Sequence, residues 1–470
     1  MRWKTPALIV ADPWVPDTWM VAPCTARCTD GLTMPEADLE LPDLTNLCDR
    51  SLPEFKRAES GFNSSPKLPT HPCMRPTEST PPPPLKVLSL GTQFAGLGGV
   101  ESVLRSHHET DADQGVDSRF LVFWEDPAPG WPRARFLGFR DTLSIRRARQ
   151  RVAAAFPDWK PDVVVYHTTW GWPYFDDLFP PARRILYLHS DTPGLDEQLQ
   201  TRAHWADGFA CVNDRIAERV MQARPDLSPD RLLRVLYPID PPAALPGPAR
   251  PWGSPLRLGF CGRLAHEQKR IDRIPELVSR LDAAGIDYRL EFLGDGPERS
   301  WLEGQLPDRA RFVFHGRKSG AEYWNILSSW DALLFVSDYE GTPIALLEAM
   351  AAGVVPVHPA IGSGGDRYAA DVDPKLAYPA GDLSALAALI TELAQWQAAR
   401  IETVRRRAID RVRGHASAVY RATFAGFLRH IASQPALPRR PLPALPPGLD
   451  WLSFRATRKL MELRRRWKGR

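Results

Sequence analysis

The stretch SDYEGTPIALLEAMAAGVVPV, Ser337 to Val357, constrains the fold of this chain more than any other. An apolar run precedes Glu340, and Thr342-Pro343 supplies an N-cap hydroxyl followed by a proline at the first helical position. Gly353 is a natural helix stop before a second apolar run. The expected order is therefore strand, loop, short helix, strand. Open α/β sheets bind ligands at the carboxyl ends of their strands, so we expect Glu340 on a ligand-binding loop.

A second acid, Glu348, lies on the expected helix in an apolar stripe with Ile344, Ala349 and Ala352. Burying a carboxylate is costly unless something hydrogen-bonds it, and a ligand hydroxyl is one such partner. The helix start between the two acids is also a ready anion site. The alternative is a surface acid and a structural acid on an ordinary βαβ unit.

Apolar runs of strand length recur along the chain, and helix-length segments or loops separate many of them. This alternation predicts mostly parallel sheets. It stops in a stretch rich in Pro, Ala and Gly and then restarts, which predicts two α/β units. The first set of strands is expected at Lys86–Leu90, Phe120–Trp124, Asp162–Tyr166, Ile185–His189, Phe209–Val212 and Leu232–Leu236. The second set is expected at Leu256–Cys261, Arg289–Leu293, Phe312–His315, Ala332–Val336, Val354–His358 and Leu376–Tyr378.

Composition divides the chain further. Residues 1–84 are rich in proline and lack periodicity, so we expect them to be largely disordered. The expected parts after them are a first domain at 85–240, a linker at 241–255, a second domain at 256–415, a helix at 416–434, and a Pro-rich linker with a basic tail at 435–470.

The same composition excludes several classes of protein. A hydrophobic content of 43% fits a globular protein with a sizeable core, and a net charge of +4 is too small to imply a nucleic-acid partner. No run of 18 apolar residues exists, and the apolar N-terminal run breaks at Asp12, which argues against a secretory signal. Six cysteines in this length do not suggest a disulfide scaffold, and their spacings match no standard zinc site. We expect a reducing, cytoplasmic location.

The motifs E-G-T-P, L-L-E-A-M-A-A-G and V-P-V, in this order, resemble the E-x7-E signature of retaining glycosyltransferases of family 4 (glycosyl transferases group 1). The resemblance covers roughly residues 86–434. It implies an α/β protein of the GT-B fold, with two facing Rossmann-like domains and a cleft between them. It also implies that the helix at 416–434 is a crossover helix that packs back across the first domain. It also implies transfer of a sugar from a UDP- or GDP-linked donor to a glycan or lipid-linked acceptor, in surface polysaccharide or glycolipid biosynthesis. The family generally needs no metal, no DxD motif is positioned for one, and no cofactor is expected.

Two cations follow the first strand of the second unit in FCGRLAHEQKR, Phe260 to Arg270. Arg263 and Lys269 lie six residues apart around a loop, and a pyrophosphate leaving group needs positive charge on several of its oxygens. The alternative is a solvated basic loop. By resemblance, Glu348 holds the ribose, and Glu340 holds the sugar together with backbone N–H groups nearby. Gly341 and Thr342 are therefore donor-binding candidates.

Glycine turns after strands provide further candidates. In TQFAGLGGVESVL, Thr92 to Leu104, Gly98 and Gly99 open a helix and can present backbone N–H groups to a phosphate or sugar. Gly294 and Gly316 end strands of the second unit, where the resemblance places the nucleoside. Each turn taken alone is also compatible with ordinary turn chemistry.

Two features of the first unit complete the candidate site. His189 ends a hydrophobic strand, and the resembled family often has a histidine there that hydrogen-bonds the donor sugar; a core histidine is the alternative. Trp170, Trp172 and Tyr174 crowd a loop at another strand end, and their flat rings are acceptor candidates because such rings pack on sugar C–H faces. Their alternative role is to cover the local core or to contact the N-terminal extension.

The end of the chain is a basic amphipathic helix candidate. Apolar residues recur at steps of three and four, and residues 449–470 contain eight cations but only two acids. Such a helix can lie on an anionic membrane surface, which would make the protein peripheral on the inner face of the plasma membrane. The alternative is a helix docked on the protein's own surface or on another subunit. The apolar face is Leu449, Leu452, Ala456, Leu460, Leu463 and Trp467, and the cations are Arg455, Arg458, Lys459, Arg464, Arg465, Arg466, Lys468 and Arg470.

Two rival functions remain open from the sequence. One is another enzyme on the same architecture, such as a nucleotide-sugar epimerase or a phosphorylase. The other is a non-catalytic protein that binds glycans or nucleotides.

Overall fold

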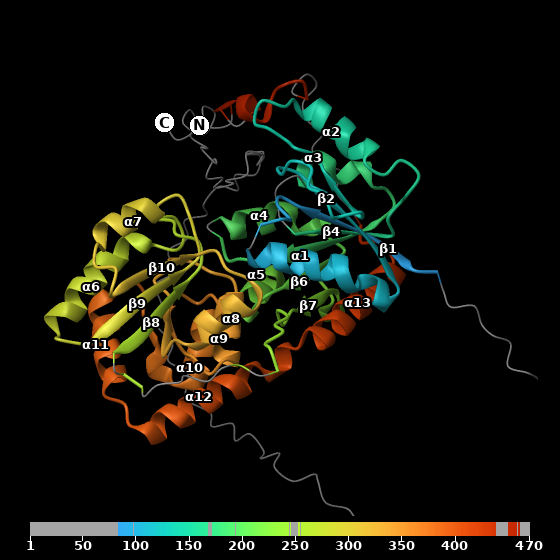
Figure 1. The fold of residues 1–470 in the computed structure, drawn as a ribbon. Helices are drawn as coiled ribbons and strands as arrows, with labels where there is room; N and C mark the ends of the chain where they lie inside the picture. Colours follow the sequence, from blue (N-terminus) through green and yellow to red (C-terminus); the bar gives the residue numbers. More distant parts are fainter. Residues whose placement is uncertain are drawn as a thin grey trace, which may run out of the picture. The chain divides into compact units, whose positions relative to one another are not determined.

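The computed structural model describes residues 83–438 and 450–460, apart from positions 97, 168–171, 193, 244, 246–251, 254 and 458. The expected disordered extension therefore lies almost entirely outside the described residues. Two parallel β-sheets follow one another along the chain, and helices cover their faces (Figure 1).

The first sheet has seven strands in the order β3-β2-β1-β4-β5-β6-β7. Its strands are β1 (Leu85–Gly91), β2 (Val116–Val122), β3 (Ala134–Phe136), β4 (Val163–Tyr166), β5 (Arg183–Leu188), β6 (Gly208–Cys211) and β7 (Leu232–Arg234). The helices between them are α1 (Gly99–Thr110), α2 (Ile145–Ala154), α3 (Trp172–Phe175), α4 (Leu195–Arg202) and α5 (Asp214–Ala223).

The second sheet has six strands in the order β10-β9-β8-β11-β12-β13. Its strands are β8 (Leu256–Cys261), β9 (Tyr288–Leu293), β10 (Phe312–Gly316), β11 (Ala332–Leu334), β12 (Val355–Ala360) and β13 (Ala377–Pro379). Its helices are α6 (Ile274–Ala283), α7 (Arg299–Gln305), α8 (Gly320–Ser328), α9 (Ile344–Ala351), α10 (Gly365–Val372) and α11 (Leu383–Ala394), and the chain continues into α12 (Ala398–Val412) and α13 (Ser417–Ser433).

Every strand pairing in both sheets is parallel, as the alternating pattern predicted. Parallel strands are covered on both faces, so they appear in the sequence as continuous apolar runs. All four residues of β4 and of β6 are buried. These runs were therefore visible from the sequence alone.

The strand order reverses at one point in each sheet. In the second sheet β8 and β11 are neighbours, and the chain moves outward from them in opposite directions. The loops that leave the carboxyl ends of two such strands diverge and leave room for a ligand between them. The equivalent neighbours in the first sheet are β1 and β4.

Strand β2 begins earlier than predicted, at Val116 rather than Phe120. Its first half alternates buried and half-buried residues, and the polar side chains Asp117 and Arg119 interrupt the apolar run. Trp159 accommodates both: its indole N–H donates to Asp117 at 2.7 Å, and the guanidinium of Arg119 lies over its ring. The three-residue edge strand β3 was not predicted, because it is too short to show a period.

Helix α9 begins one residue later than predicted. Pro343 occupies the cap position and Ile344 is the first helical residue. The hydroxyl of Thr342, expected to cap the helix, instead donates to the carbonyl of Val212 at 2.7 Å. Gly353 follows the helix with φ of 71°, as expected of a stop signal.

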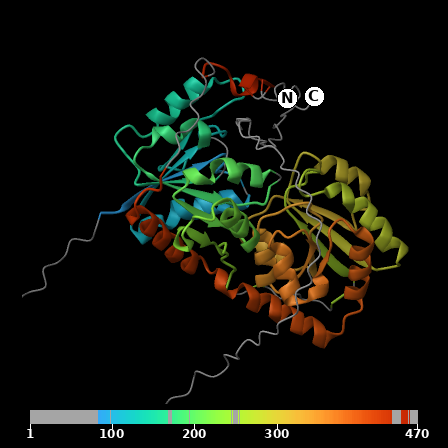
Figure 2. The ribbon, with the colours of Figure 1, turned by 180° about the vertical axis from the view of Figure 1, so that it is seen from behind.

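Helix α13 returns to the first sheet, as the resemblance implied. Tyr420 of α13 hydrogen-bonds His107 of α1 at 2.7 Å, and the chain after α13 continues along β5 to β7, where the amide of Leu437 donates to Asp207 at 3.0 Å. Figures 1 and 2 both show α13 running beside the elements of the first sheet.

Residues 450–460 dock on the protein itself, beside α2. Ser453 forms an antiparallel bridge with Ser144, and the ring of Phe454 is buried between Trp124, Phe139 and Tyr174. In Figure 2 this segment lies next to α2. The start of the expected tail thus follows the alternative prediction of a docked segment, while residues 461–470 lie outside the described residues.

Phe454→Ala is expected to destabilise the protein by about 3 kcal/mol, the usual cost of deleting a buried phenylalanine ring. Chemical denaturation would measure this loss. Trp451→Ala is the matched control, since that indole is 67% exposed and only three residues away. Equal stability of the two variants would show that the segment does not dock as described.

Candidate functional site

Glu340 lies where the reversal of strand order predicts a ligand, on the loop after β11. Its carboxylate accepts a hydrogen bond from the Lys269 ammonium at 2.7 Å and from the Ser337 hydroxyl at 2.6 Å. The amide of Gln268 donates to the other carboxylate oxygen at 3.3 Å. The carboxylate is almost fully buried, and the loop after β8 provides its counter-charge. The structure thus brings two predicted site residues together.

The loop after β8 is held in an unusual conformation around Lys269. Gln268 and Arg270 both have left-handed backbones, with φ of 62° and 51°. Such residues cost roughly 1 to 3 kcal/mol each and persist only where their surroundings hold them. Arg270 is fixed by ion pairs of 2.8 Å to Asp272 and 2.7 Å to Asp338, and the amide of Asp338 donates to the Gln268 carbonyl at 2.9 Å. These contacts tie the β8 loop to the β11 loop.

Arg263 starts the same loop and is exposed. Within the described residues its guanidinium makes no hydrogen bond or ion pair, in contrast to Lys269. Its five donors are therefore available to an anionic ligand at this loop.

The glycine turns beside this loop are required by close backbone approach. At Gly294 (φ 143°) a Cβ would lie 2.0 Å from the carbonyl oxygen of Gly262, so the turn after β9 contacts the turn after β8 directly. Gly316 ends β10 with φ of 69°, and its carbonyl accepts the amide of Gly294 at 2.9 Å. The three turns form a continuous glycine edge along β8, β9 and β10.

Glu348 lies on α9 with a protein partner that sequence reasoning missed. The hydroxyl of Tyr323, on α8, donates a hydrogen bond to Oε2 of Glu348. Burial raises the pKa of Glu348 to about 7, and the hydrogen bond from Tyr323 acts in the opposite direction. No local signal marked Tyr323, because it lies 25 residues before Glu348 in the sequence.

Gly98 and Gly99 open α1 as predicted, and Glu101 completes this turn. The carboxyl group of Glu101 folds back over the turn, where a Cβ at Gly98 would lie 2.2 Å from its Oε2. Burial raises the pKa of Glu101, while the charge of Arg263 is among the influences that lower it. A Cβ at Gly99 would lie 3.3 Å from Ile344, the first residue of α9. The glycine turn therefore lies close to the residues after β8 and β11.

His189 is engaged on both sides of its imidazole. Nδ1 is hydrogen-bonded to the hydroxyl of Tyr237, and Nε2 lies 3.0 Å from Nδ1 of His167. The ring stacks on Tyr187 with centroids 4.0 Å apart. Burial lowers the pKa of His189 to about 3, and His107 adds to this effect. His189 is therefore neutral at physiological pH and has hydrogen-bonding partners within the protein.

The loop after β11 also contacts the strand ends of the first sheet. A Cβ at Gly341 would lie 2.0 Å from the carbonyl oxygen of His189, so only glycine allows this approach. The amide of Asp191 donates to the Glu340 carbonyl at 3.2 Å, and Thr342 bonds Val212 as described above. The predicted residues His189, Glu340, Gly341 and Thr342 thus lie together.

The acceptor candidates are placed differently. Tyr174 is 3% exposed and packs edge-on against Phe454, so it covers the local core and does not offer its ring to an acceptor. This corrects the expectation for Tyr174. Trp170 lies outside the described residues. Trp172 is the first residue of α3, and its side chain is not among those described.

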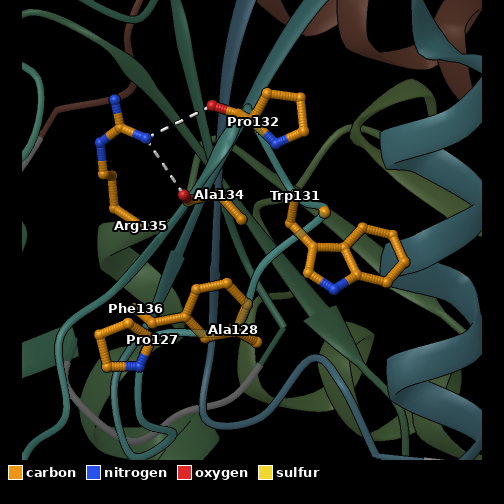
Figure 3. A pocket seen from close by; sticks show the side chains of 8 residues that line it. Pro127, Ala128, Trp131, Pro132, Ala134, Arg135 and Phe136 are labelled. Carbon is orange, nitrogen blue, oxygen red and sulfur yellow. Dashed lines mark hydrogen bonds between the residues drawn. The ribbon is translucent and has the colours of Figure 1, made fainter.

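A hollow of about 570 Å³ lies elsewhere in the first domain, between the loop after β2 and the edge strand β3. Figure 3 shows Trp131 and Phe136 lining it, with Arg135 hydrogen-bonded to the carbonyls of Pro132 and Ala134. None of the predicted site residues lines this hollow.

Neither a metal centre nor a membrane span emerges from the described part of the chain. No group of three or more His, Cys, Asp or Glu side chains there could hold a metal ion. Among the helices of residues 83–438 and 450–460, gaps aside, none is long and apolar enough to cross a bilayer.

Comparison with known proteins identifies the architecture. Residues 255–395 match the family Glycosyl transferases group 1. A 2-deoxystreptamine glucosyltransferase of Streptomyces kanamyceticus is 32% identical over 145 residues, 29% of this chain and 36% of that protein. The chain therefore matches only about a third of this relative's length. A lipopolysaccharide 1,6-galactosyltransferase of Salmonella typhimurium is 22% identical over 312 residues, 57% of this chain and 79% of that protein.

The fold is shared with a solved structure, the pneumococcal O-GlcNAc transferase GtfA in complex with UDP and GlcNAc. The TM-score is 0.59 at 12% identity, and the match covers 74% of this chain and 99% of that one. At this identity the likeness shows the fold. The two parallel-sheet α/β domains are those of the GT-B fold, and the fold class predicted from the sequence is confirmed.

Glu348→Gln is expected to change how stability depends on pH. A carboxyl group whose pKa is raised on folding stabilises the protein below its ordinary value, and this stabilisation is lost as pH rises toward about 7. The Glu348→Gln variant has no carboxyl group that titrates at this position, so it does not lose this stabilisation. Its free energy of unfolding, relative to that of the wild type, should therefore rise by about 1 to 3 kcal/mol between pH 5 and pH 8. Urea denaturation at both pH values measures this. Glu402→Gln, at an exposed position on α12, should show no such change; the same behaviour in both variants would argue against a buried, titrating Glu348.

Proposed function

We propose that this protein is a glycosyltransferase that moves a sugar from a nucleotide-sugar donor to an acceptor hydroxyl. The observation on which this rests is the buried Lys269–Glu340 pair at the strand-order reversal of a domain that matches glycosyl transferases group 1. Arg263 lies on the same loop as Lys269, and within the described residues it makes no hydrogen bond or ion pair. Two cations from one loop can form charge-assisted hydrogen bonds with the oxygens of a diphosphate, and a neighbouring carboxylate can accept hydrogen bonds from sugar hydroxyls.

The donor diphosphate would bind at Arg263 and Lys269. The ammonium of Lys269 has three donors, and one of them serves Glu340, so it can bind a phosphate oxygen without releasing that partner. The ribose would bind to Glu348, and the sugar would lie near Glu340 and the backbone of Gly341 and Thr342. Gly294 and Gly316 would lie beside the base, and Gly98 and Gly99 would close the site from the first domain.

The reaction would be driven mainly by electrostatic stabilisation of the departing diphosphate by Arg263 and Lys269. Neutral His189 would hydrogen-bond the sugar, and it would add no positive charge near the reacting carbon. We propose retention at the anomeric carbon and no requirement for a metal, following the resemblance to family 4. A UDP- or GDP-linked hexose is the donor class.

The acceptor would be a glycan or lipid-linked sugar, with Trp170 and Trp172 as its contacts. A relative of this chain is a lipopolysaccharide galactosyltransferase by name, and another is a colanic acid biosynthesis glycosyltransferase of Salmonella typhimurium. Surface polysaccharide or glycolipid biosynthesis is therefore the proposed setting, in the cytoplasm.

A transfer assay with product analysis tests the function. UDP-, GDP- and ADP-sugars are offered with and without sugar acceptors, and products are identified by mass spectrometry and NMR. A new glycosidic bond of retained configuration, lost in Glu340→Gln, supports the proposal. Conversion of the donor sugar without an acceptor indicates an epimerase, and phosphate-dependent cleavage of a glycan indicates a phosphorylase. Nucleotide binding without turnover across a broad acceptor panel indicates a binding protein.

Arg263→Ala is expected to weaken binding of a nucleoside diphosphate about 10- to 100-fold and to leave nucleoside binding unchanged, because a hydrogen bond to a charged group contributes roughly 1.5–3 kcal/mol. The Arg263 side chain is exposed and makes no hydrogen bond or ion pair within the described residues, so its removal should not disturb folding. Calorimetry with UDP, GDP and ADP and their nucleosides measures the difference. Arg406→Ala, at an exposed position on α12, is the control. Unchanged diphosphate affinity in Arg263→Ala would remove this residue from the donor site.

We further propose that the docked C-terminal segment brings the first domain to an anionic membrane surface. Trp451 and Leu460 are 67% and 48% exposed, so the segment presents these apolar side chains to solvent although its Phe454 ring is buried. Beside Trp451 lies a hollow of about 520 Å³ lined by Arg140, Arg147 and Arg151. Trp and Arg together are typical of interfacial anchoring.

Deleting residues 461–470 is expected to reduce co-sedimentation with anionic vesicles, since five cations are lost and each contributes about 1 kcal/mol near such a surface. This truncation keeps Phe454 and its docked segment. A full-length Arg147→Glu/Arg151→Glu variant tests the hollow separately, and neutral vesicles control for non-ionic adsorption. Equal partitioning of all forms onto anionic vesicles would reject the membrane proposal.

A further inference from the structure

Three side chains from separate elements of the second domain meet here: Glu348 from α9, Tyr323 from α8 and Cys261 from β8. Tyr323 extends from α8 and donates its hydroxyl hydrogen to Oε2 of Glu348. The thiol of Cys261, the last residue of β8, lies 3.8 Å from the same hydroxyl. Tyr323 is thus held between a carboxyl group and a thiol, at the strand end where the donor nucleoside is proposed to bind.

This contact divides the two oxygens of Glu348. Oε2 is occupied by Tyr323, whereas Oε1 has no hydrogen-bond partner within the part of the chain that the structure describes. Glu348 is half-buried, and Oε1 is not among the fully buried polar atoms that lack a partner, so it is open to a donor from outside the protein. A phenolic hydroxyl has one hydrogen to donate, so its use on Oε2 fixes the carboxyl plane and leaves Oε1 for an external donor.

Among the described residues, no charged side chain hydrogen-bonds Glu348 in place of Tyr323. The titratable groups that face Glu348 are Tyr323 from α8 and Cys261 from β8. Burial raises the pKa of the Cys261 thiol to about 12, so it remains neutral. Lys269, on the loop after β8, gives its hydrogen bond to Glu340. The ionised form of Glu348 is therefore supported mainly by one neutral hydroxyl.

We propose that Tyr323 is the positioning residue that holds Oε2 of Glu348 and leaves Oε1 for the hydroxyl pair of the donor ribose. The ribose part rests on the proposed function, whereas the contact between the two side chains does not. A carboxylate oxygen accepts hydrogen bonds from ribose hydroxyls more strongly than the uncharged oxygen of a protonated carboxyl group does. Nucleotide affinity should therefore fall as pH drops through the titration of Glu348, and removal of the Tyr323 hydroxyl should move this fall to higher pH.

The first experiment measures the carboxyl group directly, without a ligand. Protein labelled with ¹³C at glutamate carboxyl groups is titrated by NMR, and the Glu348 signal is assigned by its loss in Glu348→Gln. In Tyr323→Phe the midpoint should rise by about one pH unit, the equivalent of one hydrogen bond to a charged group. Tyr288→Phe is the matched control, because it also removes a buried tyrosine hydroxyl bonded to an acid, Asp282, at the opposite end of β9. An unchanged midpoint in Tyr323→Phe overturns the proposal.

The second experiment tests the consequence for binding. Calorimetry from pH 6 to pH 8 compares UDP, GDP and ADP with their 2′-deoxy counterparts. At pH 7, Tyr323→Phe should bind the ribonucleotide about 10-fold more weakly, with little change for the deoxy form. In a Glu348→Gln background the same change should have no further effect, which a merely structural role of Tyr323 would not produce. A normal melting profile of Tyr323→Phe checks the fold.

The two readouts separate the two ideas. In Tyr323→Phe the titration midpoint of Glu348 can shift while the preference for ribonucleotides over deoxynucleotides stays unchanged. That result supports the Tyr323–Glu348 contact but overturns the ribose assignment. An unshifted midpoint overturns the positioning role, even where the nucleotide binds as proposed. A shifted midpoint together with a lost ribose preference supports both.

Discussion

The burial of the Glu340 carboxylate is the constraint on which the rest of the candidate site depends. A carboxylate that is 4% exposed needs a counter-charge and several hydrogen bonds, since a buried charge left unpaired costs several kcal/mol. Lys269 provides the charge, and it reaches Glu340 only because β8 and β11 are neighbours. The left-handed backbones on either side of Lys269 and the ion pairs of Arg270 follow from this requirement. Arg263, at the start of the same loop, is left with free donors.

The two glutamates eight residues apart thereby acquire different chemistry. Glu340 has an ammonium partner, so its negative charge is neutralised before any ligand binds. Glu348 has a tyrosine hydroxyl and a neutral thiol nearby, and burial moves its pKa toward neutrality. Acids whose surroundings differ in this way can serve different functions in one site. Because burial raises the pKa of Glu348 to about 7, this carboxyl group changes its protonation near neutral pH.

Much of this arrangement was predictable because it is local or periodic. The parallel sheets follow from buried apolar runs, and Glu340, Gly353 and the β8 loop were placed by turn and cap chemistry within about 20 residues of sequence. What could not be predicted depends on contacts between distant residues. Thr342 bonds Val212 across 130 positions instead of capping α9, and Tyr323 reaches Glu348 from the preceding helix. Tyr174 was misjudged because its covering partner, Phe454, lies 280 residues later.

His189 shows how such distant contacts bear on function. Its partner Tyr237 directly precedes the chain segment that leaves the first domain, and the Tyr237 carbonyl accepts a hydrogen bond from His415 at 2.8 Å. His415 in turn bonds Tyr368 of α10 at 2.9 Å. A hydrogen-bonded series therefore joins a helix of the second domain to the imidazole in the first. Because both nitrogens of His189 are already engaged, a sugar hydroxyl can bond this ring only by replacing Tyr237 or His167. Under the proposed function, a sugar that replaced Tyr237 would break the hydrogen bond that connects His189 to the segment leaving the first domain, so the sugar and Tyr237 would compete for one nitrogen atom.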